Sequence, residues 1–230
     1  MNAYRLPNAR AIFIHDNLDE LSIAVAHRIA ASASEAINLR GVFHLVLAGG
    51  ETPRRCYEKL RELVMDWNHV HLYLGDERCL PKGDDQRNET MIRSALLEHI
   101  TIPAANVHFI PSELGADAAA AAYATTLSQI AAPDMVLLGM GEDGHTASLF
   151  PDNPATESEL PVVPVFNAPK LPPERVSFGM TTLNKVEQKI FLVAGAGKRN
   201  ALGAMSQGIL LPAARVVNAE WHIDRMSLPH

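Results

Sequence analysis

The sequence predicts an α/β protein with an open, mostly parallel, twisted sheet that has helices on both faces. Short apolar runs alternate with longer helical patterns along the 230 residues. Runs such as residues 43–48 are apolar at nearly every position, which is typical of strands buried on both faces of a parallel sheet. No repeat or low-complexity linker interrupts the alternation, so we expect one domain over residues 1–230.

Residues that favour helix ends mark the predicted helices. Asp16, Thr52 and Asn88 are N-cap residue types that precede helical patterns. Pro53 suits a first helical turn, and Gly41 suits a helix stop. The predicted helices cover residues 16–39, 52–63, 88–99, 115–130 and 197–207.

The intervening apolar runs predict the strands of the sheet. They cover residues 11–14, 43–48, 70–74, 107–110, 134–138, 175–180 and 189–193. Residues 151–173 are rich in proline and acidic residues, and their one strand candidate lies at residues 162–166. Long ordered loops of this kind are usually lids or binding segments, so we expect this one to have functional potential.

The composition limits the possible partners. The 20 Lys and Arg residues against 26 Asp and Glu residues give a net charge of −6, which leaves no basic surface for nucleic acid or an anionic membrane. An anionic ligand must therefore be held by a local cluster of donors. Cys56 and Cys79 are too few for a disulfide framework and are expected to be reduced. With no signal peptide expected at residues 1–7 and no apolar run near 20 residues, we predict a cytoplasmic protein.

Three polar, glycine-containing loops follow predicted strands, and ligands of open α/β sheets bind at the carboxyl ends of strands. In the first loop, Gly49 and Gly50 allow close backbone approach, Thr52 adds a hydroxyl, and the next helix directs its N-terminus at the loop. A phosphate fits this environment. The alternative is a plain tight turn followed by a helix cap, for which these residue types are equally typical. In the second loop, Arg78 suits phosphate or an oxyanion, while Asp76 and Glu77 are candidates for an acid or a base or for orienting the arginine. A solvated charged loop is the alternative.

The third loop contains the strongest candidate for catalysis. Three glycines flank an acidic pair and then His145, at the end of an apolar strand. We expect a helix to begin at His145, and its N-terminus would help to keep the imidazole neutral and basic. Asp143 is placed to orient the ring or a water, and Gly144 is a candidate for binding the substrate. The alternative is a structural histidine.

Three further cations lie late in the chain. Lys170 and Arg175 flank a stiff proline-rich stretch, and Lys198 follows an apolar strand at the start of a predicted helix. Each of them alone is typical of a solvated charge. Lys198 lacks the glycine spacing and the following Ser or Thr of a P-loop.

Other chemistries find little support. His69 and His71 would share a strand face, but no third ligand has metal spacing around them, so we expect no metal site. Residues 139–144 match the dinucleotide fingerprint, but no acidic residue ends a strand about 20 residues later, so we expect no NAD and no other cofactor. Cys79 lacks an evident base, and no Gly-x-Ser-x-Gly elbow is present.

The three loops together resemble the 6-phosphogluconolactonase family. The matching segments are Ala48-Gly-Gly-Glu-Thr-Pro53, Gly75-Asp-Glu-Arg-Cys-Leu-Pro81 with Asn88, and Gly139-Met-Gly-Glu-Asp-Gly-His-Thr-Ala-Ser-Leu-Phe-Pro151. The stretches around Lys170, Arg175 and Lys198 resemble the family in type and order. The resemblance spans essentially the whole chain, and the segment around His145 is its most specific part.

This resemblance implies a cofactor-free and metal-free hydrolase of 6-phospho-D-glucono-1,5-lactone in the oxidative pentose phosphate pathway. It also implies a fold shared with glucosamine-6-phosphate deaminases and ribose-5-phosphate isomerases. His145 would take a proton from the water that attacks C1, and Arg78 or the glycine-rich backbone would hold the oxyanion or the phosphate. Lys170, Arg175 and Lys198 would contact phosphate or hydroxyls. The resemblance leaves a monomer and a homodimer open.

One position departs from the family pattern. The first loop of the family usually has serine where this chain has Glu51, and a carboxylate directed at a phosphate would repel it. Either Glu51 faces outward and only the backbone and Thr52 bind, or this loop contributes less.

Two other functions remain as alternatives. Glucosamine-6-phosphate deaminases resemble the chain around His145, but they have a glutamate shortly after the histidine, where residues 148–151 here are Ser-Leu-Phe-Pro. They also have a tyrosine at the position of Arg78. A non-catalytic sugar-phosphate sensor would need a DNA-binding segment, which the net charge of −6 disfavours.

Overall fold

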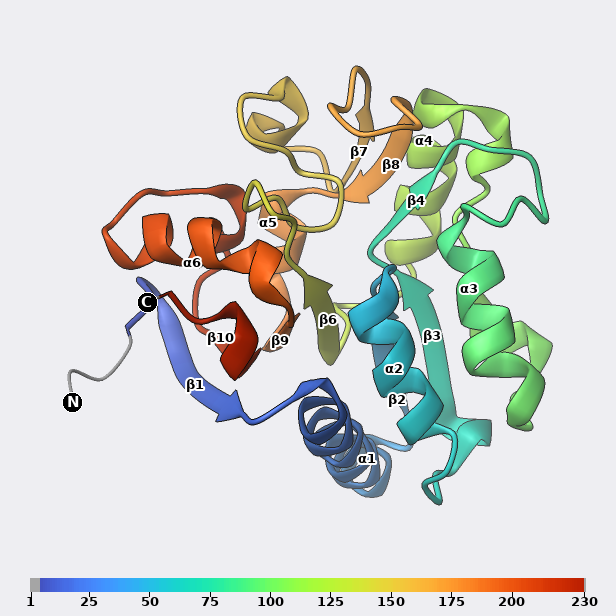
Figure 1. The fold of residues 1–230 in the computed structure, drawn as a ribbon. Helices are drawn as coiled ribbons and strands as arrows, with labels where there is room; N and C mark the ends of the chain where they lie inside the picture. The colour runs from blue at the N-terminus through green and yellow to red at the C-terminus, as the bar shows by residue number, and fades with distance from the viewer. Residues whose placement is uncertain (1–4, 230) are drawn as a thin grey trace.

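The computed structural model describes residues 5–229. Residues 1–4, which belong to the segment in which we expect no signal peptide, lie outside the described residues. Its centre is a parallel seven-stranded sheet in the order β1-β10-β9-β6-β2-β3-β5 (Figure 1). The strands are β1 (Ala9–His15), β2 (Phe43–Leu47), β3 (Val70–Leu74), β5 (Val107–His108), β6 (Met135–Gly139), β9 (Gln188–Val193) and β10 (Ala219–Asp224). The predicted open, mostly parallel sheet is therefore confirmed.

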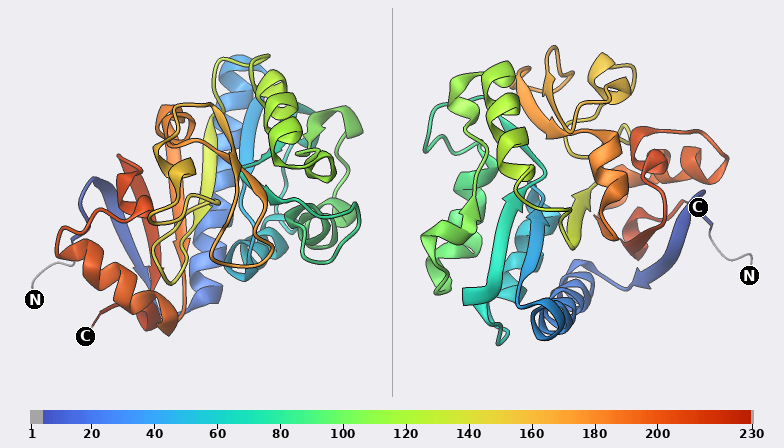
Figure 2. Two further views of the ribbon diagram at one scale, coloured as in Figure 1. Left: turned by 90° about the horizontal axis from the view of Figure 1, so that it is seen from above. Right: turned by 180° about the vertical axis from the view of Figure 1, so that it is seen from behind.

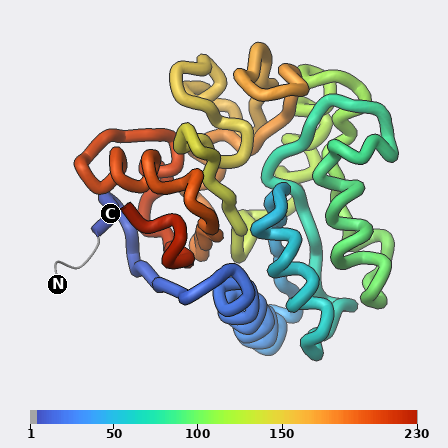
Figure 3. Tube along the Cα trace, viewed as in Figure 1, coloured from blue at the N-terminus to red at the C-terminus, as the bar shows by residue number. Residues whose placement is uncertain are grey.

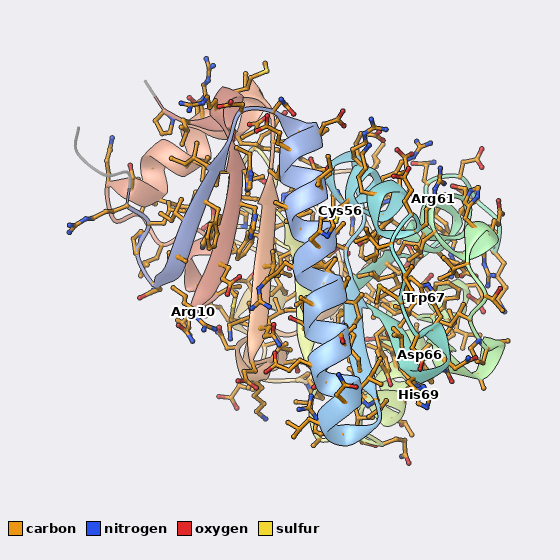
Figure 4. The ribbon with its side chains drawn as sticks, turned by 90° about the horizontal axis from the view of Figure 1, so that it is seen from below. Arg10, Cys56, Arg61, Asp66, Trp67 and His69 are labelled. Carbon is orange, nitrogen blue, oxygen red and sulfur yellow. The ribbon has the colours of Figure 1, made fainter. Side chains whose placement is uncertain are left out.

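Helices cover both faces of this sheet. They are α1 (Leu18–Arg40), α2 (Glu51–Leu60), α3 (Asn88–Ala95), α4 (Ala116–Leu127), α5 (Met180–Lys185) and α6 (Arg199–Ser206). Figure 4 shows α1 lying across one face, where it packs against α2. From above, in the left view of Figure 2, α4 lies over the opposite face. No helix within residues 5–229 is long and apolar enough to cross a membrane. The assignment to one domain and to the cytoplasm stays a prediction.

A second, three-stranded antiparallel sheet has the order β4-β8-β7 and was not predicted. It joins β4 (Asp76–Arg78), β8 (Arg175–Phe178) and β7 (Val162–Val165). The strand predicted within the proline-rich segment is therefore confirmed as β7. The pairing places Arg78 opposite Arg175, although the two are far apart in sequence. A three-residue strand in a polar segment has no apolar pattern to reveal it.

Several predicted helix starts are wrong by one or more residues. Asn17 and not Asp16 caps α1, because its side chain accepts the N–H of Glu20 at 3.0 Å. Thr52 does not cap α2, which already begins at Glu51 because Gly50 turns the chain with φ of 103°. Asn88 is the first residue of α3, not its cap. Gly41 ends α1 in the left-handed conformation, as predicted.

The C-terminal third differs most from the prediction. No helix begins at His145, since residues 141–151 form consecutive turns. The strand predicted over residues 175–180 ends at Phe178, and α5 follows it. The helix predicted from residue 197 begins at Arg199, after a short 3₁₀ turn. Strand β10, for which we made no prediction, lies between β1 and β9, so the chain finishes beside its first strand (Figure 3).

His69 and His71 do not share a strand face. His69 belongs to the 3₁₀ turn Trp67–His69 before β3, in the connection visible in Figure 4. His71 instead lies beside His108, with 3.1 Å between their ring nitrogens. Within residues 5–229 no group of three or more His, Cys, Asp or Glu side chains is arranged to hold a metal ion.

A buried histidine on β10 makes folding sensitive to acid. The ring of His222 stacks on Phe13 and on His15, and its Nδ1 lies 3.0 Å from Nε2 of His15. Burial, reinforced by the neighbouring His15, lowers the pKa of His222 to about 4.

We expect the free energy of unfolding to fall as the pH decreases from 7 to about 4. An unfolded His222 binds a proton near pH 6.5, whereas the folded one does so only near pH 4, so unfolding takes up a proton between these values. The loss reaches up to about 3 kcal/mol. Urea unfolding of His222→Gln across this range should show a smaller loss, and His27→Gln on the exposed surface of α1 should match the wild type. Equal losses in His222→Gln and wild type would contradict this assignment.

Candidate active site

The three polar loops and the two late lysines meet at one cavity of about 310 Å³. It lies beyond the carboxyl ends of β2, β3, β6 and β9, as the fold class requires. Its lining includes most of the predicted site residues: Gly49, Gly50, Asp76, Arg78, His145, Lys170, Arg175 and Lys198. Asp143 lies behind His145, while Thr52 and Gly144 are not part of the lining.

His145 and Asp143 form a tight pair at the edge of the cavity. Nδ1 of His145 lies 2.5 Å from Oδ1 of Asp143. Burial would raise the pKa of Asp143, but the hydrogen bond and charge of His145 outweigh burial and lower this pKa to about 2. An ionised Asp143 accepts a hydrogen bond from the protonated Nδ1 of His145. In this tautomer the free lone pair of the ring is on Nε2. Since no helix begins here, the hydrogen bond to Asp143, and not a helix N-terminus, orients the ring of His145.

Close packing explains the glycines around His145. A Cβ on Gly141 would lie 2.0 Å from Nδ1 of His145, so only glycine lets the ring occupy this position. Gly144 has φ of 78°, and a Cβ there would lie 2.5 Å from the side chain of Leu211. On another side, the buried ring of Phe150 packs against His145 with 4.4 Å between centroids. The imidazole is therefore held in place on several sides.

The first loop is fixed by a residue of α3. A Cβ on Gly49 would lie 1.8 Å from Oδ1 of Asn88, so the amide of Asn88 fills the space beside this glycine. Nδ2 of Asn88 donates to the backbone oxygen of Asp76 at 2.8 Å and to its carboxylate at 3.1 Å. Asn88 thus connects the first loop to the second. Sequence reasoning noted Asn88 beside the second motif but gave it no role in the site.

The two acidic residues of the second loop are both engaged. The carboxylate of Asp76 accepts a hydrogen bond from the hydroxyl of Ser148, with 2.6 Å between the oxygens, and another from the amide of Asn88. Glu77 is fully buried and accepts the backbone N–H groups of Arg78, Asn88 and Glu89. Burial raises the pKa of Glu77 to about 7, although these three donors oppose the shift. Glu77 therefore anchors the start of α3, whereas Asp76 faces the cavity.

The cationic residues differ in what holds them. Arg78 donates through Nη1 to the carbonyl of Gln86 and still lines the cavity. The side chain of Lys170 is exposed at the cavity rim. Burial lowers the pKa of Lys198, and nearby Glu142 opposes this effect. Arg175 is 5% exposed and donates three hydrogen bonds to backbone carbonyls.

The structure shows the direction of Glu51. Its side chain is 78% exposed and lies 3.6 Å from Arg54, outside the residues that line the cavity. The carboxylate therefore faces solvent. Cys79 is a poor nucleophile, because burial raises the pKa of its thiol to about 12.

Comparisons with known proteins agree on one family. A family model described as glucosamine-6-phosphate isomerases/6-phosphogluconolactonase matches residues 16–223. A 6-phosphogluconolactonase of Mycobacterium leprae is 39% identical over 222 residues, which cover 87% of this chain and 90% of that protein. A 6-phosphogluconolactonase of Mycobacterium tuberculosis is 37% identical over 236 residues, which cover 94% of this chain and 96% of that protein.

The fold has close counterparts among solved structures. The crystal structure of 6-phosphogluconolactonase from Thermotoga maritima matches with a TM-score of 0.86 and 30% sequence identity. The match covers 94% of this chain and 99% of that chain. The similarity therefore extends over the whole arrangement of sheet and loops, not over isolated motifs.

We expect Gly49→Ala to destabilise the protein by about 2 kcal/mol, because the added methyl group would overlap the amide of Asn88. The double variant Gly49→Ala/Asn88→Ala removes this overlap. Its loss of stability should be smaller than the sum of the two single losses by at least about 1 kcal/mol. Urea unfolding of the four proteins measures this coupling, and strictly additive losses would show that the two residues do not compete for one space.

Proposed function

Because the chain belongs to the glucosamine-6-phosphate isomerase/6-phosphogluconolactonase family, we propose that it hydrolyses 6-phospho-D-glucono-1,5-lactone to 6-phosphogluconate. The observation that supports this most directly is the His145–Asp143 pair at a cavity lined by Arg78, Lys170 and Lys198. A base beside a cationic cavity suits water attack on an anionic ester. The relatives named above at 37–39% identity are 6-phosphogluconolactonases.

His145 acts as the general base in this proposal. A lactone carbonyl is already electrophilic, so water can attack C1 without a covalent enzyme intermediate. Nε2 of His145 takes a proton from that water, and Asp143 stabilises the imidazolium that results. The ring then returns the proton to the leaving ring oxygen as the C1–O bond breaks.

The order of the strands suggests where the phosphate binds. Strand β6 lies between β2 and β9, so Gly49 and Gly50 stand on one side of its glycine-rich turn and Lys198 on the other. Two strand spacings amount to about 10 Å. A phosphate with a hydrogen bond on each side spans roughly 8 Å. We place the phosphate between the first N–H groups of α2 and Lys198, and the carboxylate of Glu51 is directed away from this position.

The deaminase alternative is less compatible with the site. Where that family has a glutamate after the histidine, this chain has the buried ring of Phe150 against His145. An apolar ring offers no second proton carrier there.

The carboxylate of Asp76 is bound by Ser148 and Asn88, which favours a role in orienting sugar hydroxyls.

Replacing His145 with asparagine should lower kcat by about 100-fold or more, because the variant lacks a base for the attacking water. Binding of 6-phosphogluconate should remain largely intact. Hydrolysis of freshly generated lactone, corrected for the spontaneous rate, measures the first effect, and calorimetry measures the second. His99→Asn at an exposed position provides the control. A kcat near that of the wild type would refute the role of His145.

Arg78→Ala should lower kcat/KM at least about tenfold, equivalent to about 1.4 kcal/mol of transition-state stabilisation. The reason is the loss of a guanidinium that lines the cavity. An unchanged kcat/KM would mean that Arg78 does not contact the reacting substrate.

The assay of the wild type tests the function itself. Enzyme-dependent lactone hydrolysis that chelator leaves unchanged is the expected outcome. If the protein does not accelerate hydrolysis, release of ammonia from glucosamine 6-phosphate is the next reaction to measure. Ligand binding without either reaction would favour the sensor alternative.

A further inference from the structure

Arg175 occupies an unusual position for a cation at the rim of an anion-binding cavity. It is the first residue of β8, where it pairs with Arg78 on β4 and Val165 on β7. The residue is 5% exposed, and burial lowers the pKa of its guanidinium while Asp76 opposes the shift. A guanidinium so far removed from water needs fixed partners.

The partners are the carbonyls of the preceding turn. Nε of Arg175 donates to the oxygen of Pro172 at 3.1 Å. Nη2 donates to the oxygens of Lys170 at 3.0 Å and Leu171 at 3.2 Å. Three consecutive carbonyls are thus bound by one planar group, in a geometry that a lysine ammonium cannot reproduce.

The face of the same guanidinium covers the ring that packs on the catalytic histidine. The central carbon of the guanidinium lies 5.3 Å from the centroid of Phe150, within the range of a cation–π contact. Phe150 in turn lies 4.4 Å from the centroid of His145. Arg175 therefore touches both the turn that bears Lys170 and the support of His145.

The turn held by Arg175 brings a cation to the cavity. Lys170 lines the cavity, and its charge contributes to lowering the pKa of Asp143. It also contributes to lowering the pKa of Lys198. Lys170 is otherwise on an exposed turn, where a long side chain has many conformations.

We propose that Arg175 is a positioning residue, which binds the carbonyls of residues 170–172 so that Lys170 faces the cavity. The same guanidinium supports the ring of Phe150 against His145. Because Nε and Nη2 are engaged by these carbonyls, the sequence-based expectation that Arg175 itself contacts phosphate or hydroxyls is restricted to its Nη1. The inference rests on the proposed lactonase function for its kinetic test, but its structural test does not need activity.

The kinetic test is a double-mutant cycle between Arg175→Lys and Lys170→Met. Arg175→Lys keeps the charge but loses the planar group, so we expect KM to rise about tenfold, as in Lys170→Met. If Arg175 acts through Lys170, KM of the double variant should stay within about twofold of Lys170→Met. A further rise of about tenfold in the double variant, or an unaffected KM in Arg175→Lys, would overturn the proposal.

Trypsin provides the structural test. The Lys170–Leu171 bond includes a carbonyl bound by Arg175, so cleavage there should be at least about tenfold faster in Arg175→Lys than in the wild type. Cleavage at the exposed Lys82–Gly83 bond should stay unchanged and serves as the internal control. Mass spectrometry separates the fragments. Equal rates at Lys170–Leu171 in both proteins would refute the restraint on the turn.

A measurement on the unmodified protein covers the case in which Arg175→Lys unfolds and both bonds are cut faster. The Nε–H of Arg175 can be followed by NMR with labelled arginine, with and without 6-phosphogluconate. A positioning residue keeps this proton protected from exchange in both states, because its acceptor is the oxygen of Pro172. Fast exchange in the free protein, or loss of protection on binding, would overturn the proposal. If the wild type shows no lactonase activity but the Nε–H is protected, the proposed function fails and the restraint by Arg175 stands.

Discussion

The buried contact of Asn88 with Gly49 and Asp76 is the constraint on which the site depends. One amide fills the space that a side chain at residue 49 would occupy and binds both the backbone and the carboxylate of Asp76. It thereby fixes the loop after β2 relative to the loop after β3. Glu77 reinforces the same junction by accepting the first N–H groups of α3. This junction adds side-chain contacts to the backbone hydrogen bond from Gly75 to Leu47, which already joins the ends of β2 and β3.

The charged residues of the site fall into two groups according to their partners. Glu77 and Arg175 are buried, and backbone groups bind the carboxylate of Glu77 and the Nε and Nη2 atoms of Arg175, so both residues hold segments in place. His145, Lys170 and Lys198 line the cavity and have atoms left for a ligand. Burying a charge is costly unless it is paired or hydrogen-bonded, which explains why the anchoring residues have several partners. The residues that face the cavity combine an imidazole with positive charge, which suits the proposed hydrolysis of a phosphorylated lactone.

The glycine-rich loops and the strand pattern allowed much of the site to be predicted. Gly49, Asp76, Arg78 and His145 follow strands of the parallel sheet, and the carboxyl ends of such strands lie on one edge. The helix expected after His145 was wrong, because the glycines there serve close packing of the ring and not a helix start. The part that Arg175 plays was also beyond prediction, since β4 and β8 pair across about a hundred residues of sequence.

The sequence by itself determined the fold class, the family resemblance and the three loops that meet at the cavity, because strand periodicity and loop motifs are local properties. The tertiary structure decided which polar atoms remain available to a substrate. It directed Glu51 toward Arg54 and solvent, bound Asp76 to Ser148, and turned Nε and Nη2 of Arg175 toward the carbonyls of its own preceding turn. These outcomes depend on contacts that form only when folding brings distant segments together or fixes the conformation of a neighbouring turn. Such contacts cannot be deduced from the order of residues along the chain.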